Sequence, residues 1–205
     1  MAEIKLTKNE LRAQEKKLSQ LQKYLPTLQL KKAMLQAEIY EARIEIEHCE
    51  KEMQRRFEKV EEFSPLLSAH VSINPKDIAK VVSVEKHYEN IAGVEVPYFD
   101  SITFAGLEYS LFDTPPWIDG AVDGLRAVAE AKARVLVARE KKAALEEELR
   151  MVSIRVNLFE KILIPRAKIN IKKIKVFLGD QELAAVSRAK VAKTKIVQHK
   201  KQMAR

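Results

Sequence analysis

Two long stretches of this chain repeat apolar residues every seven positions, and they flank a middle third with a different pattern. In the first stretch, two seam positions three residues apart recur over eight heptads, and thirteen of the sixteen seam residues are apolar. An ordinary amphipathic helix drifts by about 20° per heptad and loses such a register, so the pattern indicates a coiled coil. We therefore expect a coiled-coil helix over residues 1–63, capped by Thr7 with Glu10. The two seam positions read Leu11, Leu18, Leu25, Lys32, Ile39, Ile46, Met53, Val60 and Gln14, Leu21, Leu28, Leu35, Ala42, Cys49, Arg56, Phe63.

The last stretch repeats this pattern and then shifts it. Its seam reads Val128, Val135, Lys142, Leu149, Val156, Leu163 and Ala131, Ala138, Leu145, Val152, Phe159. After Pro165 the seam resumes out of register, as Ala167, Ile171, Ile174, Leu178 and Ala185. A proline removes a helical N–H and kinks the helix, which supplies a local cause for this stutter. We expect a second coiled-coil helix over residues 125–205, ending in a basic tip.

Neither helix can bury its seam alone, and the simplest partner for each is the other, folded back antiparallel. If Phe63 and Gly124 mark the turn between them, facing residues have numbers that sum to about 187. Pro26 and Pro165 then lie within about one turn of each other, so both helices should bend at the same level. Residues beyond about 186 have nothing opposite them, which leaves roughly 20 residues of single basic helix.

The segment 64–124 differs from both flanks because it holds five of the seven prolines and four of the five glycines. A strand is predicted where apolar and polar residues alternate, and a return strand follows the turn that Asn90–Gly93 offers. Pro97 in the return strand indicates a sheet edge. The apolar sides of the two strands are Val82, Val84, Tyr88 and Val94, Val96, Tyr98.

Short helices are also expected in this central region, where Ser64–Pro65 and Asn74–Pro75 each place a capping residue before a proline. The aromatic stretch Leu107–Trp117 is expected to pack the hairpin onto the coiled coil. The fold class is therefore mainly α: a long antiparallel two-helix coiled coil with a small central globular region of β-hairpin and short helices, forming one structural unit.

The net charge of +8 is strongly segregated along the chain. Residues 1–35 carry +5 and residues 161–205 carry +11, whereas residues 64–124 carry −6. A hairpin of helices would bring the two basic ends together. Five glycines in 205 residues argue against a β-sandwich or barrel. The single cysteine, Cys49, excludes an internal disulfide and fits a reducing compartment, and neither a signal peptide nor a membrane-spanning run is apparent.

No enzyme chemistry attaches to specific residues. The two glycine-rich phosphate-binding motifs, G-x-x-x-x-G-K-[ST] and G-x-G-x-x-G, are both absent from the sequence. The four histidines are far apart in sequence. His48 beside Cys49 resembles a ligand pair, but adjacent helical residues point about 100° apart, so we expect a buried core cysteine and no metal or cofactor. The carboxylates Glu61–Glu62 and Glu146–Glu148 are interpreted as solvated helix faces. Three seam cations must either snorkel, meet a partner or lie at an exposed edge: Lys32, Arg56 and Lys142.

The basic tip is a candidate interaction site. Its lysines could bind nucleic acid through electrostatic attraction to the phosphates, but no aromatic residue follows Phe177 to stack on bases. We therefore expect the basic tip to bind in a recess of a partner protein rather than to bind nucleic acid. The candidate residues are Lys190, Lys193, Lys195, Lys200 and Lys201.

Two motifs give the chain a resemblance to a known family. Arg155–Glu160, leading to Ile164–Arg166, matches R-V-N-x-x-E-x-x-x-I-P, and Asn90–Val94 with Val96–Pro97 matches N-I-x-G-V-x-V-P. Both are patterns of the D subunits of the V-type and A-type (archaeal and bacterial) rotary ATPases, which the chain resembles over nearly its whole length. The motif residues carried over are Asn90, Gly93, Pro97, Arg155, Asn157, Glu160, Pro165 and Arg166.

The resemblance implies a central rotor shaft without catalytic residues. Its coiled coil would sit in the ring of A and B subunits, its globular part would bind the F subunit, and its far end would dock on the funnel-like subunit on the proteolipid ring. This implies a peripheral location on the cytoplasmic side of the membrane, without insertion, and coupling of ATP to proton or sodium movement. A prefoldin-like chaperone subunit is the alternative, but its arms should be shorter and it lacks the R-V-N motif. A basic coiled-coil nucleic-acid binder is the third interpretation.

Overall fold

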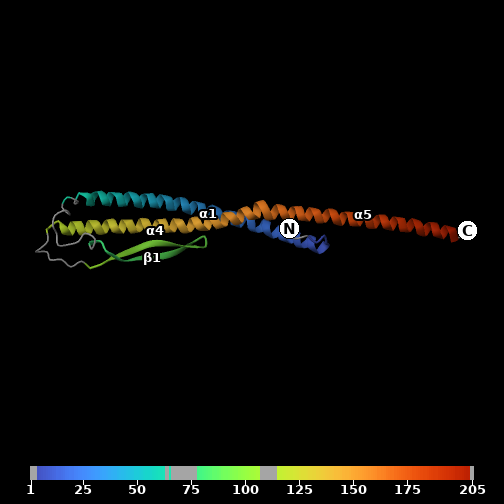
Figure 1. The fold of residues 1–205 in the computed structure, drawn as a ribbon, viewed down its shortest axis with the longest axis horizontal. Coiled ribbons are helices and arrows are strands. Elements are labelled where there is room, and N and C mark those ends of the chain that lie inside the picture. The colour runs from blue at the N-terminus through green and yellow to red at the C-terminus, as the bar shows by residue number, and fades with distance from the viewer. Residues whose placement is uncertain (1–3, 63–64, 66–77, 107–114, 204–205) are drawn as a thin grey trace. The chain divides into compact units, whose positions relative to one another are not determined.

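The computed structural model describes residues 4–62, 65, 78–106 and 115–203, with side chains described only as far as residue 199. Its elements are helix α1, a hairpin of two strands, and a helical run interrupted by a π-helix, η1 (Figure 1). In chain order they are α1 (Lys8–Glu61), β1 (Val81–Ile91), β2 (Val94–Phe104), α4 (Ile118–Asn157), η1 (Leu158–Leu163) and α5 (Ile164–Met203). The mainly helical fold with a small antiparallel hairpin is the one expected from the sequence.

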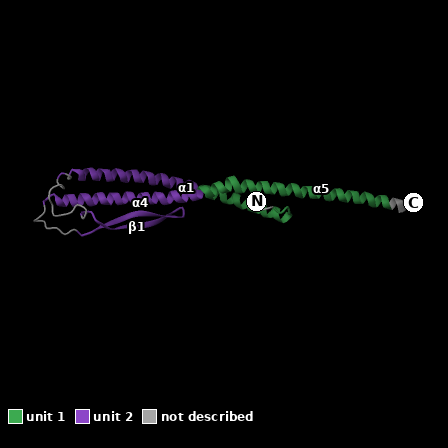
Figure 2. Ribbon diagram, viewed as in Figure 1, with its two compact units in different colours: residues 1–30, 153–205 green, residues 31–152 purple. Residues whose placement is uncertain are grey.

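The chain divides into two compact units (Figure 2). Unit 1 contains residues 1–30 and 153–205, and unit 2 contains residues 31–152. This division differs from the three segments expected from the sequence, because α1 and α4 each contribute residues to both units. The second long helix also begins at Ile118, seven residues before the expected start at 125.

In unit 2, α1 packs antiparallel on α4 through the predicted seams. Leu35 and Leu145 are completely buried, and Ile39 and Ala138 are 5% exposed. Ion pairs beside this seam link Arg43 to Glu146, Glu50 to Arg139 and Arg56 to Glu130. The numbers of each pair sum to within a few residues of the expected 187, so the antiparallel register is confirmed in this unit.

In unit 1, the start of α1 packs on the end of the helical run. Leu21, Val156, Ala167 and Ile174 form its buried seam. Ion pairs between Lys175 and Glu15 and between Lys8 and Glu182 continue the register. The Thr7 hydroxyl accepts a hydrogen bond from the Glu10 N–H, so the Thr7 half of the predicted cap is present, while Glu10 Oε1 accepts from Gln14 Nε2. All residues from 181 to 199 are exposed, as expected where α1 has ended.

The shift of the seam near Pro165 coincides with a π-helix. The π-helix η1 precedes the proline, and the Ile164 N–H donates to the Phe159 carbonyl five residues back. A π-turn inserts one extra residue, which moves the seam by one position and returns it to the α1-facing side as Ala167 and Ile174. The π-turn lies directly before Pro165, the residue that the sequence offers as the local cause of the shift and that lacks a backbone N–H. That both helices bend at the level of Pro26 and Pro165 stays a prediction.

The hairpin forms where the sequence places it. Ile91 pairs with Val94 across a two-residue turn, in which Ala92 and Gly93 have φ of 52° and 82°. Positive φ at both positions is the type I′ geometry, whose twist matches paired strands. The Gly93 N–H donates to Asn90 Oδ1 over 2.9 Å, which closes the turn.

The apolar face predicted for β1 is wrong in part. Val82 and Tyr88 are 66% and 62% exposed, whereas Val96 on β2 is fully buried, as expected. The pairing shifts twice, between Val81 and Ser83 and between Glu85 and Lys86, and such bulges re-aim the side chains of a strand.

The rest of the central region is described only in part. Trp117 packs against a small core of Ile78, Ile118 and Val122. The expected short helices at Ser64 and Asn74–Pro75, and residues 107–114 of the aromatic stretch, lie outside the described residues. Within the described part of the chain, no helix combines the length and apolarity needed to cross a bilayer.

Candidate interaction surfaces

A cavity of about 530 Å³ in unit 2 is lined by residues of α1, β2 and α4. His48 and Cys49 both line it, so the structure brings this sequence pair to one surface. Burial raises the pKa of Cys49, and the nearby carboxylates of Glu45 and Glu52 raise it further. The thiol therefore stays protonated at neutral pH, which makes it a poor nucleophile. Among the described residues, no group of three or more His, Cys, Asp or Glu side chains is arranged to hold a metal ion.

Lys141 joins three elements of unit 2, and among the described side chains it is the only charged one that is buried. Its Nζ lies 2.9 Å from Glu45 Oε2 on α1 and 4.1 Å from the ring centroid of Tyr98 on β2. Burial by itself lowers the pKa of Lys141, but hydrogen bonds to Glu45 and Tyr98 and their charges outweigh it and raise that pKa. Lys141 stays charged at neutral pH and fixes both α1 and the hairpin against α4.

The heptad pattern points to Lys142, the neighbour of Lys141, and not to Lys141 itself. Lys142 lies on the heptad seam but is only half-buried, and its Nζ lies 3.5 Å from Glu146 one turn later on the same helix. Lys141 faces the hairpin, and a heptad pattern carries no information about a third element beside the pair. The one available signal was the aromatic residue Tyr98 in a strand expected to pack on the helices.

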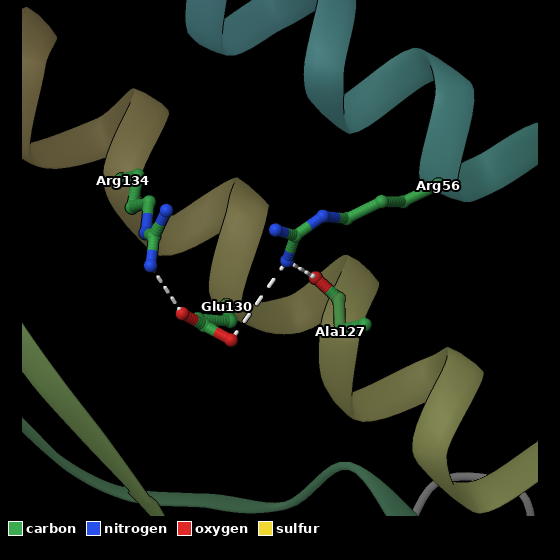
Figure 3. Close-up of polar contacts among 4 residues, drawn as sticks. All are labelled: Arg56, Ala127, Glu130 and Arg134. Atoms are coloured by element: carbon green, nitrogen blue, oxygen red, sulfur yellow. Dashed lines mark hydrogen bonds and ion pairs between the residues drawn. The ribbon is translucent and has the colours of Figure 1, made fainter.

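The seam cation Arg56 meets a partner, which is one of the alternatives expected. Its Nη1 donates to the Ala127 carbonyl over 3.1 Å and lies 3.8 Å from Glu130 Oε2 (Figure 3). The other oxygen of Glu130 accepts from Arg134 Nη2 over 2.6 Å. The Arg134 guanidinium lies 5.2 Å from the ring centroid of Phe99, so this network also reaches the hairpin.

The first motif builds the hairpin tip and its contact with the helices. Asn90 and Gly93 form the turn, and Pro97 is buried in β2. A Cβ added at Gly93 would lie 3.7 Å from Lys31 Nζ, and Lys31 itself is paired with Glu148 over 2.6 Å. Asn90 and Gly93 therefore shape the hairpin turn, whereas Pro97 also lines the cavity of unit 2 described above.

The second motif lies in unit 1 around the π-helix. All five of its residues are exposed: Arg155, Asn157, Glu160, Pro165 and Arg166. Arg166 also lines a cavity of about 490 Å³ with Glu10 and Gln14 of α1. Exposure of a polar motif along one helical run favours contact with another molecule over a role in the core.

The basic tip is a single exposed helix. Lys190, Lys193 and Lys195 are exposed, and the Thr194 hydroxyl donates to the Lys190 carbonyl. Lys200 and Lys201 belong to α5, but their side chains lie outside the described part. The tip therefore presents its described lysines to solvent, where a partner can reach them.

Comparison with known proteins identifies relatives over nearly the whole chain. The family of ATP synthase D subunits matches residues 10–194. The D subunit of the V-type ATP synthase of Chlamydia abortus is 45% identical over 202 residues, covering 98% of this chain and 97% of the relative. The corresponding protein of Chlamydia caviae is 46% identical over 202 residues, with 98% and 97% covered. That of Chlamydia pneumoniae is 43% identical over 195 residues, with 95% and 93% covered.

Proposed function

Because this chain belongs to the D-subunit family of V-type ATP synthases, we propose that it is the central rotor shaft of such a complex. In this role it transmits torque between the catalytic head of A and B subunits and the ion-translocating membrane ring. ATP hydrolysis or synthesis is thereby coupled to proton or sodium transport. The chain itself holds no catalytic residue in this proposal and acts mechanically.

The observation that carries the proposal is the bracing of two antiparallel helices in each unit. A shaft must pass torque without losing it as elastic twist, and two helices locked along a seam resist twist better than one. In unit 2 the seam is reinforced by Lys141 and by the Arg56–Glu130–Arg134 network. Each exposed ion pair contributes only about 0–1 kcal/mol, so the buried seam supplies most of the rigidity.

The basic tip is proposed to turn inside the head. Its exposed surface combines small Ala and flexible Lys residues, such as Lys190 and Lys193, with the exposed aliphatic residues Val191, Ile196 and Val197. The lysines suit a part that must not bind any one of several equivalent positions too tightly. Such solvated charges form weak contacts that exchange readily.

The remaining partners are assigned on the same basis. The hairpin region of unit 2 is proposed to bind the F subunit, and the outer face of β1 supports this because Val82 and Tyr88 are exposed there. The funnel-like subunit on the proteolipid ring is proposed to receive the end of the shaft opposite the tip. The complex would then hold this chain on the cytoplasmic side of the membrane, with no nucleic-acid partner.

Truncation of the tip tests this proposal. A chain that ends at Val186 lacks residues 187–205, all of which lie beyond the last ion pair to α1, between Lys8 and Glu182. We expect it to bind the F subunit normally while head assembly or ATP-driven ion transport is weakened. A full-length Lys190→Gln/Lys193→Gln/Lys195→Gln variant serves as the control, since it separates loss of charge from loss of length. Unchanged coupled turnover in the truncated complex would contradict the proposed role of the tip.

A further inference from the structure

Helix α5 has two apolar faces: one is buried against α1, and the other is largely exposed. Ala167 and Ile174 are buried against α1, being 3% and 0% exposed. A second row recurs at seven-residue intervals: Ile169, Val176 and Leu183 are 55%, 57% and 69% exposed. At about 100° per residue, this second row lies roughly opposite the buried seam. We refer to Ile169, Val176 and Leu183 as the outer stripe.

The outer stripe borders a groove. A cavity of about 710 Å³ in unit 1 is lined by Ile169, Val176 and Phe177 of α5 and by Leu6 of the segment before α1. The walls are therefore largely aliphatic and aromatic, and they come from the segment before α1 as well as from α5. A row of exposed aliphatic residues beside an apolar groove is typical of an interaction site rather than of a solvated helix face.

Positive charge edges the outer stripe on both sides. Lys172 and Lys173 are exposed, line the same groove and have no ion-pair partner among the described residues. Asp180 is the one acidic side chain in the groove. Arg166 is also exposed and lies on the same side of the outer stripe as Lys173. Lys175 lies farther around the helix from the stripe and is paired with Glu15. A binding partner whose charge complements these basic side chains carries carboxylates.

We propose that the outer stripe is a docking surface for an apolar helical segment edged by carboxylates, supplied by a subunit of the catalytic head. The proposal rests on the rotor function above, because that function places α5 inside the head. Stripe residues seven apart are about 10 Å from each other along the helix, a spacing that a second helix reproduces with its own heptad positions. Since the opposite face of α5 is covered by α1, contact is one-sided, and only the head subunit that the stripe faces is engaged at a given angle.

The first test removes the stripe in the full-length chain. We compare an Ile169→Ser/Val176→Ser variant with a matched Leu136→Ser/Ile154→Ser control, whose side chains on α4 are each 55% exposed. Affinity for a purified head of A and B subunits is measured by biolayer interferometry. We expect the stripe variant to bind about tenfold more weakly or worse, because two aliphatic side chains lose their burial, while the control stays within about twofold.

A second pair of measurements identifies the occupant. A Lys172→Glu/Lys173→Glu variant keeps the apolar stripe and should also weaken head binding, with a smaller dependence on salt. If the stripe variant fails to fold, the effect of this charge variant on head binding tests the outer-stripe proposal instead. A photo-crosslinking amino acid at Val176 should attach to a peptide of a head subunit that is rich in Asp and Glu.

The outcomes are separable. If the unsubstituted chain does not bind the head, the rotor proposal and this one both fail. If it binds and the stripe and charge variants bind equally well, only the outer-stripe proposal is overturned. Crosslinking to a second copy of this chain, or to a peptide without carboxylates, would overturn it as well.

Discussion

Single residues of unit 2 show how closely the paired helices approach. Gly124 lies inside α4, where a glycine costs about 1 kcal/mol of helix stability relative to alanine. A Cβ added there would lie 2.8 Å from Val60 Cγ2 on α1. The glycine is therefore explained by the contact between helices, and not by the turn that the sequence indicated.

This contact predicts opposite effects of one substitution at two helical glycines. Gly124→Ala should lower the free energy of unfolding by about 1–3 kcal/mol, because Val60 must move to admit the methyl group. Gly179→Ala in α5 meets nothing within 4 Å and should stabilise by up to about 1 kcal/mol. Urea denaturation followed by circular dichroism measures both. A Gly124→Ala protein as stable as the Gly179→Ala protein would contradict the close approach.

Lys141 predicts a pH-dependent contribution to stability. Lys141→Met should cost about 1.5–3 kcal/mol at pH 7, since it removes a charged hydrogen bond to Glu45 and leaves Tyr98 without its cation. Because the folded pKa of Lys141 is raised, this contribution is complete below about pH 10 and is lost as pH rises through the folded pKa. Denaturation at pH 7, 9 and 11 should give equal losses at the first two values and a smaller loss at the third.

The adjacent lysine supplies the control. Lys142→Met changes a half-buried seam position whose only ion pair within the described part of the chain is with Glu146 one turn away, so it should cost less than about 0.5 kcal/mol. If both variants lose the same stability, Lys141 does not join the hairpin to the helices as described.

At the scale of elements, local periodicity carried most of the prediction. The heptad seams indicated the two helices and their register, because every heptad repeats the same contact and Leu35 and Leu145 are buried as expected. The turn at Asn90–Gly93 was predictable because its chemistry is local. What could not be predicted depended on contacts between distant elements: the burial of Lys141 and the outward face of Val82.

The π-helix η1 was visible in the sequence only as a shift by one residue. The seam passes from Leu163 to Ala167, and a proline between them offers a competing explanation for any irregularity. Only the hydrogen bond from the Ile164 N–H to the Phe159 carbonyl distinguishes a π-turn from a proline kink.

Crosslinking tests the pairing of helices in unit 1. In a Cys49→Ser background, Glu15→Cys/Lys175→Cys should react with a short bis-maleimide within one chain, because the native side chains lie 2.9 Å apart. Glu15→Cys/Lys190→Cys is the control, since position 190 is about 22 Å farther along α5. Mass spectrometry of tryptic peptides reports both. Equal crosslinking of the two pairs would show that α1 and α5 do not keep this register.

At the scale of the whole molecule, the two compact units carry net charges of opposite sign. Counting Lys and Arg against Asp and Glu gives +14 for unit 1 and −6 for unit 2. Both basic ends of the sequence therefore belong to the same unit, as a hairpin of helices requires. A positive unit with an exposed outer stripe and tip, and a negative unit with the hairpin, would meet partners of different charge, which fits one chain that contacts several subunits.

Rotation within the assembled complex tests the proposed role most directly. The head is fixed to a surface, and a gold particle is attached to a single cysteine introduced as Glu95→Cys in a Cys49→Ser chain, where Glu95 is exposed on the hairpin. On addition of ATP, the particle should turn continuously in one direction and stop when hydrolysis is inhibited. A particle that stays still while the same complexes hydrolyse ATP would contradict the rotor shaft.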